Sequence, residues 1–466
     1  MVKGFANRFS NSVSQNGLII SILSVLIFLS CADQTLATRL SHYNIRWAQP
    51  LLLIGAIYFL VRNQFNFFLN RDVLWALGFG FIYCFLLILG SGLHADATTG
   101  VIKVMWVVFN LGGAFLASRL LSSENAKKGM LLGLFFSVLV PIIDVIYIYG
   151  FGHLEPLLGK TQTGIEIEGR IFPRVHGFYY EPSYAAAAWS FGYLWLLPQR
   201  VFLKNGIDLI FKSFILLGVF ITTSRLGILL IFCGTFGFTI ASLFSTIRWR
   251  YKWQSIFSLF QPKICVAGIV ILFLLSSGGQ RYFSFLIGPL GLKSSLCRIV
   301  HDGIPSNWTT LETKQLFCGK VYSDQTEEIE SQPYLSKGRT TSEGNRIQNL
   351  IRSFNVFLRS PWLGHGVRRW SDGRIKLVSE STWFEILIET GIVGLIAFIG
   401  ALGMMLKVSL NATNRSAFYQ SGLLIPLLIH FGISWNLSYS VLPRLDQWVL
   451  LFTGLAFYRF NRKMEN

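Results

Sequence analysis

Residues 74–92 read LWALGFGFIYCFLLILGSG and contain no charged side chain. A helix needs about 20 mostly apolar residues to cross the hydrocarbon core of a bilayer, and this stretch is long enough. It does not alternate between apolar and polar residues, as the strands of a membrane barrel do. Backbone polar groups in lipid must be paired within the spanning structure, so we interpret the stretch as a transmembrane helix.

Similar stretches recur along the chain, which has 466 residues, is 52% hydrophobic and is only 14% charged. The sequence therefore predicts an all-α polytopic membrane protein with about 12 transmembrane helices. No small-residue cleavage pattern follows the first stretch, so we expect a span there and not a signal peptide. The candidate spans are 17–37, 47–61, 74–92, 100–121, 130–150, 183–198, 207–223, 226–244, 264–279, 383–406, 419–440 and 446–460.

Lys and Arg gather on one side of these spans when successive loops are assigned to alternate sides of the membrane. Short cytoplasmic loops of membrane proteins carry an excess of these residues, so both termini are predicted to be cytoplasmic. The loops 151–182 and 280–382 then lie outside the cytoplasm. The net charge of +18 reflects cytoplasmic loops near anionic lipid, and no nucleic-acid partner is expected.

The chain is expected to divide into three parts. Residues 1–279 form an N-terminal bundle of about nine helices, residues 280–382 a large external loop, and residues 383–466 about three further helices. Residues 346–358 place apolar side chains at helical spacing, which predicts an amphipathic helix on the membrane surface. Cys297 and Cys318 lie in the same loop, and the sequence leaves open whether they form a disulfide.

Polar residues that could carry chemistry gather in three clusters on the external side. The first cluster ends the loop 151–182 and comprises Arg170, Arg174, His176, Tyr180 and Glu181, directly before a helix start. A carboxylate, an imidazole and two guanidinium groups that converge there could bind an anionic head group and activate a hydroxyl. The alternative is that Glu181 only complements the dipole of the helix that follows.

The second cluster is the turn around Ser224 and Arg225, between two apolar spans. A guanidinium can bind phosphate through two parallel hydrogen bonds, which the ammonium group of Lys cannot copy. The alternative is an arginine in a tight turn that extends its charge to the membrane surface.

The third cluster joins the segment PWLGHG at 361–366, called the PWLGHG turn below, to the span that begins near 383. Glu385 and Glu389 are four residues apart, so they share one face of that helix. Carboxylates within a membrane are costly and usually functional, although an ion pair with a basic residue of a neighbouring span would also explain them. A structural role is favoured for Asp144 and His430, which are single polar groups within spans.

Three motifs in this order resemble the O-antigen ligase and polymerase superfamily of bacterial envelopes. They are SRLG at 224–227, F-x-x-x-P-W-L-G-H-G from Phe357 and E-x-x-x-E-T-G-I-V-G-L from Glu385. The Tyr-Glu-Pro-Ser element at 180–183 is similar to that of polymerase members. Ligases of this superfamily usually carry a His shortly before the E-T-G helix, whereas residues 378–382 here read VSEST. The resemblance is therefore closest to the repeat-unit polymerases.

The resemblance implies a fold like that of the C-superfold glycosyltransferases and an enzyme of the bacterial inner membrane with a periplasmic active face. Donor and acceptor are then glycans on undecaprenyl diphosphate, surrounded by membrane lipid, and a flippase and a chain-length regulator are the expected protein partners. The catalytic residues would be Glu181, as the base, with His176 and Arg174. The diphosphate and the glycan would be bound by Arg170, Arg225, Tyr180, Arg346, Arg352, His365, Glu385 and Glu389.

Two other functions remain open at this point. An O-antigen ligase transfers a finished glycan to lipid A-core, and a lipid-linked oligosaccharide transporter would also have about a dozen spans. A transporter places its polar groups near the bilayer midplane between two repeats, whereas here they gather at one face. The sequence contains no metal-binding, nucleotide-binding or phosphate-loop motif, so neither a metal nor a cofactor is predicted.

Overall fold

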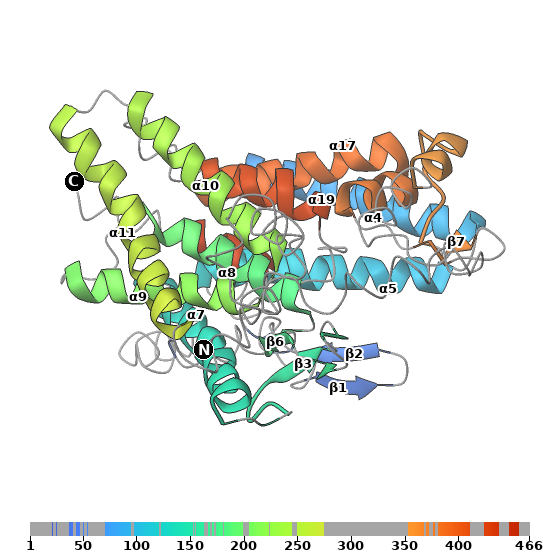
Figure 1. Ribbon diagram of the computed structural model, residues 1–466. Helices are drawn as coiled ribbons and strands as arrows, with labels where there is room; N and C mark the ends of the chain where they lie inside the picture. The colour runs from blue at the N-terminus through green and yellow to red at the C-terminus, as the bar shows by residue number, and fades with distance from the viewer. Residues whose placement is uncertain are drawn as a thin grey trace, which may run out of the picture.

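The computed structural model of the chain is mostly helical, as the sequence predicts (Figure 1). Most of the predicted spans 17–37 and 47–61 lies outside the described residues, and so does most of the loop 280–382 with Cys297 and Cys318. The structure describes residues 21, 25, 37–40, 43–46, 50, 54, 70–94, 97–120, 123–151, 153, 155–162, 166–167, 170–171, 174–179, 181–198, 205–222, 224–244, 249–274, 353–367, 370–371, 376–377, 381–410, 424–437 and 447–455.

The helices lie where the apolar stretches predict them. They are α4 (Arg71–His94), α5 (Ala97–Val107), α6 (Gly113–Leu120), α7 (Ser123–Val145), α8 (Pro182–Leu196), α9 (Asn205–Ile221), α10 (Arg225–Phe244), α11 (Trp249–Leu274), α17 (Thr382–Leu410) and α19 (Trp435–Leu437). Three π-helical turns continue them, namely η1 (Val108–Gly112), η2 (Ile146–Gly150) and η5 (His430–Ser434). Further helical residues lie at 353–359, 424–429 and 447–455.

Five helical stretches in the described part of the chain are long and apolar enough to cross a membrane. They are Arg71–Leu93, Ala97–Leu116, Lys128–Tyr149, Leu226–Leu243 and Thr382–Ser409. The chain is therefore a multi-pass membrane protein. A total of about 12 spans stays a prediction.

Helix α11 begins well before the predicted span at 264. The charge pattern assigned Arg250 and Lys252 to a loop, whereas both lie in the first turns of this helix. Ile256 and Leu259 are buried, so the packing of one face continues the helix through a region that hydropathy alone assigns to a loop.

The loop 151–182 contains short strands that the sequence analysis did not predict. They form two antiparallel pairs, β3 (Lys160–Gln162) with β6 (Arg174–Gly177), and β4 (Glu166–Ile167) with β5 (Arg170–Ile171). Two more antiparallel pairs are β1 (Ala37–Leu40) with β2 (Tyr43–Arg46), and β7 (Trp370–Ser371) with β8 (Lys376–Leu377). Strand β6 leads directly into the turn before α8, so this strand pairing fixes where α8 begins.

Helices α4 and α17 lie side by side and run antiparallel (Figure 1). At one end, Lys407 Nζ lies 2.8 Å from Asp72 Oδ1. At the other end, the backbone N–H of Val367, shortly before α17, donates to Ser91 Oγ at 2.8 Å. The alternation of the predicted spans requires this relation between the two helices. Which end faces the outside stays a prediction.

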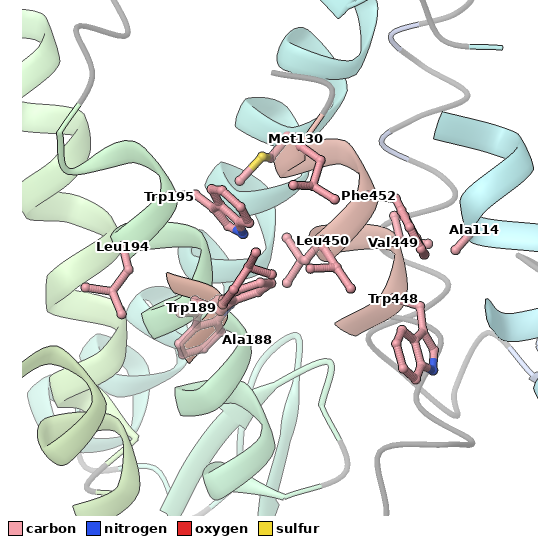
Figure 2. Packing of buried hydrophobic residues seen from close by; sticks show 14 of the residues in the cluster. Ala114, Met130, Ala188, Trp189, Leu194, Trp195, Trp448, Val449, Leu450 and Phe452 are labelled. Atoms are coloured by element: carbon pink, nitrogen blue, oxygen red, sulfur yellow. The ribbon is translucent and has the colours of Figure 1, made fainter. Parts of the chain in front are cut away.

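Helix α8 lies within the bundle, and all its residues from 184 to 196 are buried. Its Trp189 and Trp195 lie close to Leu450 and Phe452 of the C-terminal helical residues (Figure 2). A Cβ atom added at Gly227 of α10 would come within 2.8 Å of Ala186 Cβ, so small residues let α10 approach α8 closely. This contact holds the start of α10 against the first half of α8.

Candidate functional site

Glu385 and Glu389 lie on one face of α17, as their spacing predicts, and both bind Lys103 of α5. Lys103 Nζ is 2.6 Å from Glu385 Oε1 and 2.5 Å from Glu389 Oε1. The sequence analysis allowed an ion pair for the two carboxylates but did not identify Lys103. A lysine inside the predicted span 100–121 was the signal that could have found it.

Three polar atoms around this ion pair have no hydrogen-bond partner among the described residues. They are Glu385 Oε2, Glu389 Oε2 and the hydroxyl of Tyr83 on α4. Tyr83 lies on α4, which packs along α17, the helix that carries both glutamates. Side-chain exposure is 14% for Lys103, 18% for Glu385 and only 8% for Glu389. We call these four residues the Lys103 cluster.

The charge of the Lys103 cluster decides what it can bind. When both carboxylates are ionised, they outnumber the one ammonium group and leave a surplus of one negative charge and of hydrogen-bond acceptors. Such a site attracts hydrogen-bond donors and repels anions. Of the two ligands predicted for Glu385 and Glu389, the arrangement favours the glycan over the diphosphate.

The PWLGHG turn closes a break in α17. The helix leaves helical geometry at Gly391, which has φ 66° and ψ −168°. Two backbone N–H groups after the break donate to carbonyl groups of the turn, at 2.8 and 3.3 Å. In return, the N–H groups of His365 and Gly366 donate to carbonyl groups just before the break, at 2.8 and 2.9 Å. The turn thus provides the backbone partners that the break removes from the helix.

Glycines allow the turn to approach this closely. Gly364 and Gly366 have φ values of 69° and 73°, in the left-handed region that favours glycine. A Cβ atom on Gly366 would lie 2.2 Å from the carbonyl carbon of Gly90. The turn is therefore in direct backbone contact with α4 as well as with α17.

His365 was predicted to bind substrate, and the structure gives its ring a role within the turn. Its Nε2 lies 2.9 Å from the carbonyl oxygen of Val356 in the helix at 353–359. That helix confirms the described part of the predicted amphipathic helix. Phe354 and Leu358 are 45% and 54% exposed, which suits contact with lipid.

Glu181 is the N-cap residue of α8, with an extended backbone (φ −139°, ψ 152°) and Pro182 at the first helical position. Its side chain makes no capping hydrogen bond. Instead, Ser183 Oγ donates to Glu181 Oε2 at 3.3 Å. The carboxylate is half-buried and makes no capping hydrogen bond, although its place at the start of α8 still suits the helix dipole. Whether it has a further role stays a prediction.

His176 is 2% exposed and lies in β6. Its Nδ1 pairs with the carbonyl oxygen of Tyr179, whose backbone N–H donates to the carbonyl oxygen of His176 at 3.2 Å. These bonds close the turn that leads to Glu181, so His176 shapes the approach to this carboxylate. Its catalytic role stays a prediction.

Several predicted site residues lie outside what the structure describes. Tyr180, Arg346 and Arg352 are outside the described residues. The backbones of Arg170, Arg174 and Arg225 are described, but their side chains are not. Arg225 opens α10, which packs on α8 through Gly227, and Ser190 Oγ of α8 donates to the carbonyl oxygen of Gly227 at 3.2 Å. The backbone of the turn around Ser224 and Arg225 is thereby held against α8, whose N-cap residue is Glu181.

Asp144 has a structural role, as predicted. Its Oδ1 accepts the backbone N–H groups of Leu157 and Leu158 at 2.9 and 2.8 Å. Its Oδ2 accepts the N–H group of Gly159 at 2.8 Å. This carboxylate therefore ties the loop 151–182 to the end of α7.

His430 also has structural partners. Its ring stacks on Phe191 of α8 with 4.3 Å between ring centroids, and its Nε2 accepts the indole N–H of Trp435 at 3.1 Å. Among the described residues, no three His, Cys, Asp or Glu side chains are grouped so that they could hold a metal ion.

Residues 210–399 match the protein family described as O-antigen ligase. The match contains Arg225, the PWLGHG turn, Glu385 and Glu389, and it begins after Lys103 and Glu181, which lie outside it. No curated protein matches the chain. The family match thus supports the resemblance to the O-antigen ligase and polymerase superfamily over residues 210–399. The match supports a membrane function of the O-antigen ligase or polymerase type.

Proposed function

We propose, from the O-antigen ligase-type domain at residues 210–399, that this chain is a polysaccharide polymerase. It joins oligosaccharide repeat units carried on undecaprenyl diphosphate into O-antigen, capsule or exopolysaccharide. In this proposal it lies in the bacterial inner membrane, with both termini in the cytoplasm and the active face in the periplasm. A flippase supplies its substrate, and a chain-length regulator limits the product.

The family match carries this proposal, and two features favour a polymerase over a ligase. Residues 378–382 read VSEST and lack the His that ligases usually carry before the E-T-G helix. The polymerase-like element at 180–183 carries Glu181, whose carboxylate is half-buried and not used for capping. A transporter is less well supported, because the Lys103 cluster lies near one end of α17 and not at its middle.

In the proposed reaction, the bond from the anomeric carbon of the donor to its diphosphate is replaced by a glycosidic bond to the acceptor sugar. The hydroxyl of the acceptor glycan attacks the anomeric carbon of the donor glycan, and the bond from that carbon to the diphosphate oxygen breaks. Glu181 accepts the proton of the hydroxyl, and undecaprenyl diphosphate leaves as an anion. Arg225 with Arg170 and Arg174 stabilises the negative charge of the leaving group, which is the larger contribution to catalysis.

Deletion of the gene, followed by gel analysis of surface glycans, tests the proposal. A polymerase mutant should carry at most one repeat unit on its core and lose the ladder of longer chains. A mutant with naked core that accumulates long lipid-linked polymer would indicate a ligase instead. Accumulation of single lipid-linked repeat units on the cytoplasmic side of the membrane would indicate a transporter.

Replacing Glu181 with glutamine should collapse the ladder of long chains towards single units. General-base help from a positioned side chain contributes about 10²–10⁴-fold to the rate, and glutamine keeps the shape but cannot accept the proton. Glu155, an exposed carboxylate of the same external loop, provides the matched control. A normal ladder from Glu181→Gln at equal protein level would remove Glu181 from the reaction centre.

Replacing Arg225 with lysine should lose most of the polymerase activity, although the charge is kept. Lysine cannot form the two parallel hydrogen bonds by which a guanidinium binds phosphate. Arg359, exposed on the helix at 353–359, provides the control, and Arg359→Lys should leave the ladder unchanged. Chains of normal length from Arg225→Ala would exclude this residue from diphosphate binding.

A further inference from the structure

We propose that Tyr83, Glu385 and Glu389 form a subsite that binds hydroxyl groups of a neutral sugar in the acceptor glycan. This inference rests on the proposed function, because that function supplies the glycan. It assigns the glycan to a site that is built from α4 and α17 and positioned by Lys103 of α5. These residues orient the sugar, while the proton transfer belongs to Glu181.

The first argument is the number of buried polar atoms that lack a partner. Tyr83 is 1% exposed and Glu389 is 6% exposed, and the Tyr83 hydroxyl and Glu389 Oε2 have no hydrogen-bond partner among the described residues. Glu385 Oε2 is a third such atom. Folded proteins pair the large majority of their buried polar groups, and each exception calls for an explanation. A ligand that binds all three atoms explains them together.

The second argument is that Lys103 binds one oxygen of each carboxylate, and the other oxygen of each has no hydrogen-bond partner among the described residues. Its ammonium group binds the Oε1 atom of each glutamate and thereby fixes both carboxylates. The Oε2 atoms are the remaining acceptors, and Tyr83 adds a group that can donate or accept. Because the ammonium group already bridges the two carboxylates, the position that a metal cation would take between them is filled.

The third argument is the chemistry of the ligand that fits. The surplus negative charge repels phosphate and acidic sugars, so a diphosphate is a poor ligand. Hydroxyl groups of a neutral sugar can donate to the two carboxylate oxygens and exchange a hydrogen bond with the tyrosine. Hydrogen bonds to charged acceptors are stronger than those between neutral groups. Such bonds to the two carboxylates can therefore orient a neutral glycan that binds weakly overall.

The fourth argument is rigidity. The backbone carbonyl oxygen of Glu389 accepts the N–H of Gly366 in the PWLGHG turn at 2.9 Å, and the break at Gly391 lies two residues further. The carboxylate is therefore held from both sides, by the turn at its backbone and by Lys103 at its side chain. A binding group held in this way loses little freedom when the sugar arrives.

The experiment measures binding of the glycan without its lipid. Lipid-linked repeat unit is collected from cells that lack this protein, and mild acid releases the glycan from its diphosphate. Saturation-transfer NMR then measures binding of the free glycan to the full-length protein in nanodiscs. The same preparations are assayed for polymer formation from the intact lipid-linked unit, so the two proposals have separate readouts.

Tyr83→Phe is the decisive variant, because it removes only an oxygen that has no protein partner. Loss of a buried unpaired hydroxyl should leave thermal stability unchanged or raise it, whereas the affinity for the glycan should fall about 5-fold. Tyr193→Phe provides the matched control. Tyr193 is also buried, but its hydroxyl already binds Lys263 Nζ at 3.0 Å, and the variant should bind the glycan like the wild type.

The outcomes separate the site from the function. Wild-type affinity in Tyr83→Phe, or no binding of free glycan to the wild type, would overturn the subsite even if the protein makes polymer. Glycan binding by the wild type that is lost in Tyr83→Phe supports the subsite. If the wild type binds the glycan but forms no polymer from lipid-linked units, the proposed polymerase function is overturned and the subsite is not. Equal affinity for the glycan after its primary hydroxyls are oxidised to carboxylates would overturn the assignment to a neutral sugar.

Discussion

Replacing Gly391 with alanine is expected to prevent this protein from reaching a stable folded state. Gly391 has φ 66° and ψ −168°, a conformation essentially restricted to glycine, and another residue there is strained by about 1–3 kcal/mol. A Cβ atom would also lie 2.2 Å from the carbonyl oxygen of Trp362, which is backbone and cannot rotate away. Such overpacking costs about 1–3 kcal/mol more.

Gly403 provides the matched control on the same helix. A Cβ atom at Gly403 would meet nothing within 4 Å, and alanine is the better helix former. Gly403→Ala should therefore melt at the wild-type temperature or above it, in the same detergent. Wild-type yield and melting temperature for Gly391→Ala would contradict the proposed docking of the PWLGHG turn on the break in α17.

Replacing Lys103 with methionine should destabilise the protein by about 3–5 kcal/mol, because it leaves two carboxylates buried without their partner. Glu385 and Glu389 would then repel each other in a poorly solvated part of the bundle. Thermal unfolding in nanodiscs measures this loss. Adding Glu385→Gln and Glu389→Gln to Lys103→Met removes the charges and should restore most of the stability.

Lys407 is the matched control for Lys103, since it binds an acidic residue of α4 from the other end of α17. The side chains of Lys407 and Asp72 are 63% and 31% exposed, and exposed ion pairs contribute about 0–1 kcal/mol. Lys407→Met should therefore change the unfolding temperature little. Equal losses from the two lysine variants would mean that the Lys103 cluster is solvated and does not hold α5 to α17.

Both predictions concern one junction. The break at Gly391, the PWLGHG turn and the Lys103 cluster lie around the same few residues of α17, and the turn lies within the loop 280–382. Glu389 belongs to two of them: its backbone carbonyl accepts a hydrogen bond from the turn, and its carboxylate binds Lys103. Changes in the turn are therefore expected to reach the carboxylates of the subsite through the backbone.

Much of the local structure followed from the sequence. The uninterrupted apolar run at 74–92 identified the helix found as α4, and the spacing of Glu385 and Glu389 placed both carboxylates on one face. The first feature depends on the length of an apolar run and the second on the period of a helix. Both can therefore be recognised within a single segment of the sequence. The motif resemblance rests on consecutive residues too, and the family match at residues 210–399 supports it.

The tertiary structure decided which segments meet. Lys103 and Tyr83 join the two glutamates from helices that lie far earlier in the chain, and no period within a segment relates them. The buried face that extends α11 to Trp249 and the strand pairs of the loop 151–182 also depend on neighbours in space. The sequence of an apolar helix shows which of its faces is polar, but it does not show which helix packs against it. Lipid is as apolar as the side chains, so burial of apolar surface does not select the neighbouring helix. Close packing and buried polar contacts select it instead.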